Sequence, residues 1–252
     1  MRSPVPAPLA LTAAVVLIGL LASATFARVE VEDRGDRRCI RTDSLPDHPT
    51  GRFPNPGNPH SIAAQSISVC LTATPTRGTR PQPVRVTGIA ENGVLIRPGT
   101  ADYYDANSPR GHSRDRSSGW NLDGMGARDL LGLDDQNAHV GPDGLYHYHG
   151  VAPALAGASP DTRIGWAADG FEIHYLGDQG RSSYMLLPGP RQTAPGGPHD
   201  GTYNEDWVYI HGAGNLDQCN GGEIDGKYVY VATDTYPFFP RCLYGTEITR
   251  IK

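Results

Sequence analysis

Two histidines and two tyrosines alternate in the segment GPDGLYHYHG, residues 141–150. Successive side chains of a β-strand point to opposite faces, so His147 and His149 would share one face and Tyr146 and Tyr148 the other. Neutral imidazole is a common ligand of zinc and copper, and two imidazoles on one face can bind a single ion. The alternation therefore predicts a metal-binding or active site on the histidine face of this strand.

A third histidine precedes this pair in the chain. His139 lies eight residues before His147, across a loop rich in glycine and proline. That loop is long enough to fold back and offer a third ring nitrogen. We therefore predict His139, His147 and His149 as ligands of one zinc or copper ion. Further candidates, which only the fold could bring near, are His112, His174 and His211.

The same strand has an alternative interpretation that involves no metal. Buried polar groups need hydrogen-bond partners, and each imidazole could bond a backbone carbonyl or a carboxylate in a purely structural network. His174 shares a strand face with Glu172 in GFEIHYL, which favours a structural or surface role for that pair. His48, His60 and His199 occur in loops rich in proline and glycine, where we expect them to be solvated.

Carboxylates in the neighbouring segments could act as ligands or bases. Asp143 and Asp169 each precede a glycine, a position where a side-chain to backbone bond in a turn is the ordinary role. The oxygen-rich loop 133–144 could hold calcium, but its spacing does not match the EF-hand loop, so calcium fits less well than zinc or copper. The chain has no G-x-S-x-G, H-E-x-x-H or phosphate-loop motif.

The amino-terminal segment predicts the compartment in which this chemistry would occur. Arg2 precedes an uncharged apolar stretch, residues 9–24, which ends in small residues. This order is typical of a secretory signal peptide cleaved after Ala24 or Ala27, and the stretch is shorter than the ~20 residues of a spanning helix. We expect a signal peptide over residues 1–27, a periplasmic or extracellular protein, and no stable membrane insertion after cleavage; a retained anchor is the alternative.

Composition narrows the classes of partner. Without Arg2 the formal net charge changes from −5 to −6, which argues against the basic surface that nucleic-acid binding needs. The 31 glycines and 22 prolines predict many turns and no long helices. The expected partner is therefore a metal ion or a small ligand.

The four cysteines predict two disulfides, because an even number in an exported chain favours a disulfide framework. No C-x-x-C pair occurs, which argues against a zinc site built from these residues. Of the three possible pairings we favour Cys39–Cys70 and Cys219–Cys242, since each closes a short loop near one end of the chain.

Short runs with β-propensity recur along residues 28–252, and Asp-Gly or Asn-Gly pairs precede several of them, as in hairpins. Helix candidates are confined to 127–133 and 152–157, while 74–83 is predicted as a polar loop and 28–60 as an extended N-terminal arm. The predicted fold class is mainly β (β-rich α+β): a single domain over residues 28–252, with sandwich-like antiparallel sheets, long Gly/Pro-rich loops and a few short helices. The predicted strands cover residues 67–72, 84–89, 93–98, 145–149, 163–168, 171–176, 183–187, 206–210 and 227–232.

Five longer segments of the chain resemble the YHYH-domain proteins, secreted bacterial proteins named for the Tyr-His-Tyr-His tetrad. The segments fall in the order that the family has them and cover most of the expected mature chain. The resemblance implies the architecture and the position of the site, but the family has no settled activity to transfer. The segments are residues 39–59, 141–150, 164–175, 200–221 and 227–246.

The chain departs from the family pattern in two places. Some members carry a second Tyr-His-Tyr-His where this chain has Tyr228-Val229-Tyr230-Val231, so a site built from both tetrads would lack two histidines here. Glu223 or Asp225 could replace a lost ligand. Glu172-Ile173-His174 also departs from the family pattern and could supply an additional ligand, His174.

Three functional hypotheses remain open. In the first, an exported protein binds zinc or copper, or a small ligand, through the histidine cluster around the tetrad. In the second, the same histidines hold the activating metal of a hydrolase-like enzyme, with an open position for water and a carboxylate such as Asp169 as base. In the third, the protein is a non-catalytic binding or structural module. Additional site residues would come from Asp169, His174, His211, Tyr146 and Tyr148.

Overall fold

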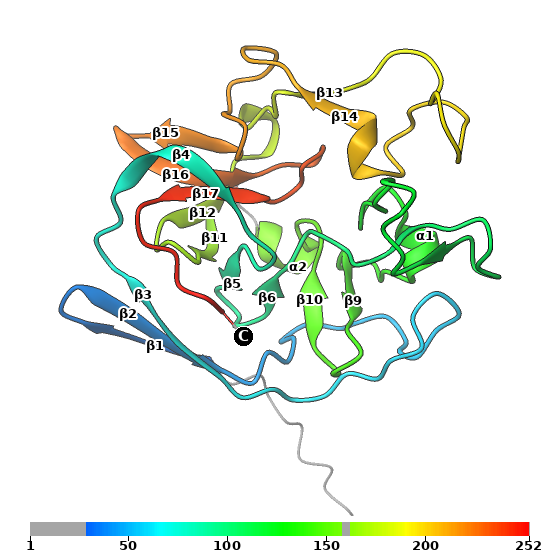
Figure 1. Ribbon diagram of the computed structural model, residues 1–252. Coiled ribbons are helices and arrows are strands. Elements are labelled where there is room, and N and C mark those ends of the chain that lie inside the picture. Colours follow the sequence, from blue (N-terminus) through cyan, green and yellow to red (C-terminus); the bar gives the residue numbers. More distant parts are fainter. Residues whose placement is uncertain (1–28, 158–161, 252) are drawn as a thin grey trace, which may run out of the picture.

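A computed structural model of the chain describes residues 29–157 and 162–251, so the predicted signal peptide lies outside the described residues. Within that part, eight strands form one mixed sheet, whose strand order is β15-β16-β12-β11-β5-β6-β10-β9 (Figure 1). These strands are β5 (Gly88–Ala90), β6 (Leu95–Ile96), β9 (Ala138–Val140), β10 (Tyr146–Tyr148), β11 (Thr162–Ala167), β12 (Glu172–Tyr175), β15 (Gly221–Ile224) and β16 (Lys227–Ala232).

The pairing pattern of this sheet is the same when it is followed outward from its centre in either direction. At the centre β5 pairs antiparallel with β11, with Ile89 opposite Trp166. On one side β6 pairs antiparallel with β5, β10 parallel with β6, and β9 antiparallel with β10. On the other side β12, β16 and β15 repeat these three pairings in the same order. The sheet therefore consists of two equivalent four-stranded halves.

The sequence repeats at matching positions of the two halves. GIAENGVLIR, residues 88–97, corresponds to GWAADGFEIH, residues 165–174, and LDDQN, residues 133–137, corresponds to LDQCN, residues 216–220. We call the first half unit A (β5, β6, β9 and β10) and the second half unit B (β11, β12, β15 and β16). Sequence reasoning missed this repeat, because only a few turn and tyrosine positions are shared across segments of different length.

Both predicted disulfides are confirmed, and each fixes a smaller sheet at the periphery. Cys39–Cys70 links two neighbouring strands of the three-stranded sheet β1-β2-β3. Cys219–Cys242 links the turn before β15 to β17, which pairs with β4. The strands involved are β1 (Val29–Arg34), β2 (Arg37–Thr42), β3 (Ile67–Thr72), β4 (Arg77–Pro83) and β17 (Cys242–Gly245).

The predicted fold class is confirmed: the chain is a β-rich single domain, and its two described α-helices have four residues each. The main sheet is mixed rather than purely antiparallel, because β6–β10 and β12–β16 pair in parallel. The helices are α1 (Arg128–Leu131) and α2 (Pro153–Ala156), with 3-10 turns at Gly177–Gln179 and Asn204–Asp206; the other short strands are β7 (Tyr103–Tyr104), β8 (His112–Ser113), β13 (Tyr184–Leu186) and β14 (Trp207–Tyr209).

Several segments differ from the sequence prediction: the strand predicted over 84–89 begins only at Gly88, and β7, β8, β9, β15 and β17 were not predicted as strands. The stretch 74–83 was predicted as a polar loop, which is wrong, because residues 77–83 form β4. Its two prolines are compatible with a peripheral two-stranded sheet, where missing N–H donors can face away from the partner strand. The expected arm, residues 28–60, contains the β1–β2 hairpin at 29–42, and its remainder runs without regular structure to the neighbourhood of β10.

The core lies on the sheet and includes both tetrad tyrosines. Tyr146, Tyr148 and Tyr230 are fully buried among aliphatic side chains such as Ile89 and Leu95. In the part of the chain that the structure describes, no helix has the length and apolar character needed to cross a membrane.

Candidate functional site

The three histidines predicted as ligands meet at the outer edge of unit A. His139 on β9 is the direct cross-strand partner of His147 on β10, and His149 follows β10 immediately. Cross-strand partners in an antiparallel pair point to the same face, so the β9–β10 hairpin returns His139 to the face of the other two. Their ring centroids are 4.6–4.9 Å apart, and one ligand atom from each lies within 4.8 Å of the others.

Each of the three rings is oriented by a backbone carbonyl. Nδ1 of His139 lies 2.9 Å from the Leu131 oxygen, Nδ1 of His147 3.0 Å from the Leu145 oxygen, and Nδ1 of His149 3.1 Å from the Pro98 oxygen. A carbonyl oxygen only accepts hydrogen bonds, so each Nδ1 must donate a proton. In a neutral imidazole this leaves Nε2 unprotonated, with its lone pair free to bind a cation.

Two of the free nitrogens are close enough to share one ion. Nε2 of His147 lies 3.1 Å from Nε2 of His149, and two nitrogens at this separation subtend roughly 100° at an ion with the ~2.0–2.1 Å bonds of zinc. With such bonds no two nitrogens can be more than about 4.2 Å apart, so a pair at the 4.8 Å limit would have to close by about 0.6 Å. The arrangement suits a zinc or copper ion.

Burial disfavours a proton as the alternative cation. It lowers the pKa of His147 and of His149 well below the ordinary histidine value, and the neighbouring His139 adds to the effect. The pKa of His139 is also lowered, mainly by burial. The cluster is therefore held in the neutral form that metal binding requires.

Two local features keep these rings in place. The Leu131 carbonyl belongs to the last turn of α1, where helix carbonyls lack intrahelical partners and are free to accept. Gly124 lies against the His149 ring, and a Cβ there would come within 2.1 Å of Nδ1. Buried Asp123 fixes this turn by accepting the N–H groups of Met125 and Gly126. The sequence showed Asp123-Gly124 only as a turn signal.

The tyrosines of the tetrad lie on the other face of β10, apart from the histidines. Tyr146 donates its hydroxyl to Asp134 over 2.8 Å, and Tyr148 accepts from the Asn92 amide over 2.9 Å. His48 lies 2.5 Å from the Tyr148 hydroxyl through Nε2. The expectation that His48 is simply solvated is therefore wrong, because the segment after β2 passes over this face.

Three other candidate residues lie away from the cluster. Asp169 is buried in unit B, where it accepts the Tyr230 hydroxyl over 2.7 Å and the Gly245 N–H over 2.8 Å; burial raises its pKa. His174 pairs with Glu172 on β12 over 2.9 Å. His211 is exposed in the loop after β14. None of the three lines the cavity at the cluster.

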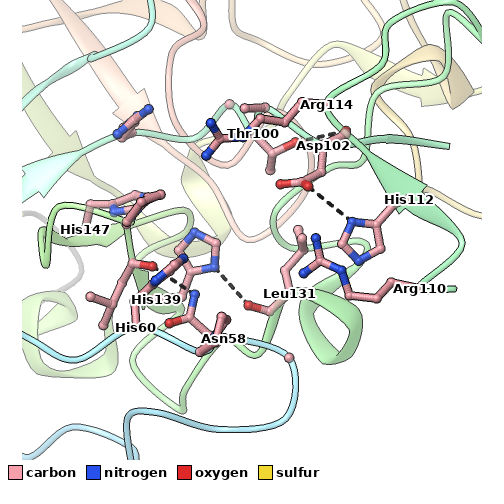
Figure 2. A pocket seen from close by; sticks show the side chains of 18 residues that line it. Asn58, His60, Thr100, Asp102, Arg110, His112, Arg114, Leu131, His139 and His147 are labelled. Carbon is pink, nitrogen blue, oxygen red and sulfur yellow. Dashed lines mark hydrogen bonds and ion pairs between the residues drawn. The ribbon is translucent and has the colours of Figure 1, made fainter. Parts of the chain in front are cut away.

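A cavity of about 160 Å³ opens in front of the cluster and is lined by His139 and His147 (Figure 2). His112, which the sequence offered as a remote candidate, also lines it and is held by Asp102 over 3.2 Å. His60 lines it too, so its setting is more specific than the solvated loop we expected. Sequence reasoning missed the charged lining residues, which carry no local motif: Asp102, Arg97, Arg110 and Arg114.

The fold and the site together define a disulfide-bonded, β-rich domain with a buried cluster of three histidines beside a small cavity. The family model described as YHYH protein matches residues 66–245, most of the chain. The chain belongs to the YHYH protein family, as its tetrad and neighbouring segments had indicated. No curated protein and no solved structure matches it.

Proposed function

We propose that this protein binds one zinc or copper ion through Nε2 of His139, His147 and His149. The observation that carries the proposal is the set of three Nδ1–carbonyl contacts, which leaves Nε2 unprotonated in each ring of a cluster whose ligand atoms lie within 4.8 Å of one another. A purely structural network would give each buried nitrogen a complementary partner. Here the Nε2 atoms of His147 and His149 face each other, and neither has a proton to donate.

The surroundings support an ion with a free coordination position. Zinc sites that act in catalysis have three protein ligands and leave the fourth position to water or substrate. The cavity reaches His139 and His147 and would give access to that position. Backbone carbonyls that hold the other ring nitrogen are the usual support for metal-bound histidines.

A hydrolase-like activity is the second candidate, and one observation favours it. His112 lines the same cavity and is held by Asp102 over 3.2 Å, as a general base is commonly oriented. In this version His112 replaces Asp169 as the base, because Asp169 is committed to Tyr230 and Gly245 in unit B. The metal would activate water, and His112 would take its proton.

The compartment forms part of the proposal. Export through the segment 1–27 would bring the chain to the periplasm or the cell exterior. The two disulfides support this location, because such bonds persist in oxidising compartments.

The test is metal binding by untagged protein comprising residues 28–252. Calorimetric titration with zinc and with copper should give one site in the wild type and none in His147→Ala/His149→Ala. His211→Ala is the matched control, because it removes an exposed histidine away from the cavity and should bind as the wild type does. The copper spectrum in electron paramagnetic resonance should show three nitrogen ligands.

Equal binding by the wild type and the double variant would overturn the proposal. Should the double variant fail to fold, His139→Asn decides the matter, since His139 lies on the short edge strand β9. Unchanged affinity and three nitrogen couplings in that variant would place the site elsewhere.

A further inference from the structure

Three arginines line the cavity beside the histidine cluster, namely Arg97, Arg110 and Arg114. None of the three guanidinium groups makes a hydrogen bond or ion pair with another described residue. Among the described residues, eight other arginines form ion pairs with carboxylates; Arg163, for example, pairs with Glu91 at 2.7 Å. The cavity therefore gathers three guanidinium groups that form no ion pair within the described part of the chain.

The lining is positively charged although the whole chain is negative. Asp102 is the only carboxylate among the described residues that line the cavity, and it is held by His112. The formal net charge of the chain is −5, so this local excess does not follow from composition. Burial lowers the pKa of Arg97, the charges of Arg85 and Arg114 lower it further, and the charge of Asp143 offsets part of this effect. Like charges repel one another, and an anion bound between them would relieve that repulsion.

We propose that the cavity binds an anionic group with two or more oxygens, a phosphate or a carboxylate, beside the metal ion. Guanidinium groups bind both kinds of group through paired N–H donors. A volume of about 160 Å³ admits the anionic end of a substrate and excludes a large apolar body. The position of this group relative to the metal rests on the proposed function, whereas the anion site itself consists of the arginines.

The experiment is calorimetric titration of residues 28–252 with inorganic phosphate and, separately, with acetate. Each titration is run on chelator-treated protein and on zinc-loaded protein. Arg110→Gln/Arg114→Gln is the test variant, because both side chains are exposed and their loss should leave the fold intact. Arg116→Gln is the matched control, since Arg116 is also exposed but does not line the cavity.

We expect one of the two anions to bind the wild type and the control alike, and to bind the double variant roughly tenfold or more weakly, as lost charged hydrogen bonds imply. The phosphate and acetate arms identify which oxyanion the site prefers. Zinc affinity should be the same in all three proteins, because the arginines are not ligands.

Three results would overturn the inference: no binding of either anion to the wild type, equal binding by all three proteins, or binding that needs zinc and ignores the arginines. The third result would overturn the arginine site but would still support the proposed metal site. Conversely, arginine-dependent phosphate binding in a protein that takes up neither zinc nor copper would support the anion site and remove the proposed function.

Discussion

Units A and B carry different side chains on the same hairpin. In unit A His139 pairs across the hairpin with His147, and in unit B Gly222 pairs with Val229 in the same register. His149 likewise corresponds to Val231: their N–H groups bond the equivalent carbonyls of Asn137 and Asn220. All three histidines of unit A are thus absent from unit B.

The two units share the first tyrosine of the tetrad and the aspartate that accepts its hydrogen bond. Tyr146 donates to Asp134 over 2.8 Å, and Tyr228 donates to Asp217 over 2.9 Å. Each aspartate also accepts two backbone N–H groups of the turn that follows it. The comparison separates the tetrad into two roles: the tyrosines belong to the fold, and the histidines belong to the site.

Unit B also shows what fills the space when the histidines are lost. Val229 and Val231 pack with Leu216, Leu176 and Ile224 in an apolar cluster. Glu223 and Asp225, which could have replaced a lost ligand, are exposed on the β15–β16 hairpin. The hairpin therefore needs no imidazoles for packing, and their presence in unit A points to binding.

Converting unit A to the pattern of unit B should have the largest effect. His147→Val/His149→Val should lower zinc affinity more than ~100-fold, beyond the 10–100-fold typical of residues that only support a ligand. It should remain folded, because unit B carries these side chains on the same backbone. Calorimetry measures the zinc affinity of the variant, and thermal unfolding of the metal-free protein shows whether it is folded. An unfolded variant would contradict the equivalence of the two units.

A smaller loss is expected from Gly124→Ala. The new Cβ would lie 2.1 Å from Nδ1 of His149, so the ring must move, and zinc affinity should drop roughly 10–100-fold. Gly35→Ala is the control, because Gly35 lies in the β1–β2 turn outside the cavity lining and a Cβ there meets no atom within 4 Å. Zinc titration of both variants tests this prediction. Equal zinc affinities would show that the close approach of Gly124 does not fix the His149 ring.

The stability of the metal-free protein should depend on pH through unit A. The folded-state pKa values of His147 and His149 are lowered, so below the ordinary value of about 6.5 the unfolded chain binds more protons than the folded one. Stability should therefore fall as pH decreases from about 6.5 toward the folded-state values. Urea unfolding of chelator-treated protein at several pH values tests this dependence. In His147→Val/His149→Val the free energy of unfolding should lose most of its dependence on pH in this range.

Substitution of the tyrosines should have the smallest effect on zinc affinity, and it should lower stability equally in the two units. Tyr146→Phe and Tyr228→Phe should each cost about 1–3 kcal/mol of stability by removing a hydrogen bond to a carboxylate. Zinc affinity should stay within about twofold in both. A large loss of zinc affinity in Tyr146→Phe without a loss of stability would assign that tyrosine to the site.

The histidine cluster was predictable because its geometry is local. A period-two alternation and a hairpin loop suffice to place His139, His147 and His149 on one face. The disulfide pairs were accessible for a similar reason, since each closes a short loop. Strand positions at residues 67–72 and 227–232 also followed directly from local β-propensity.

The cavity was not predictable, because its walls come from separate parts of the chain. Arg97, Arg110 and Asp102 reach the cluster only through the long connection between β6 and β9. β4 was missed for a similar reason, since its partner β17 lies near the other end of the described chain. Such contacts depend on topology, which neither propensity nor spacing records.

The central β5–β11 pair has a further consequence for how such a chain can assemble. Gly88 faces Ala167 as Ala90 faces Gly165, so the two edges present equivalent residues to each other. A surface that pairs with an equivalent copy of itself is the definition of an isologous contact between subunits. The molecule is thus built like a symmetric dimer tethered into one polypeptide. In such an architecture one protomer-like half can keep its ligands while the other is free to lose them.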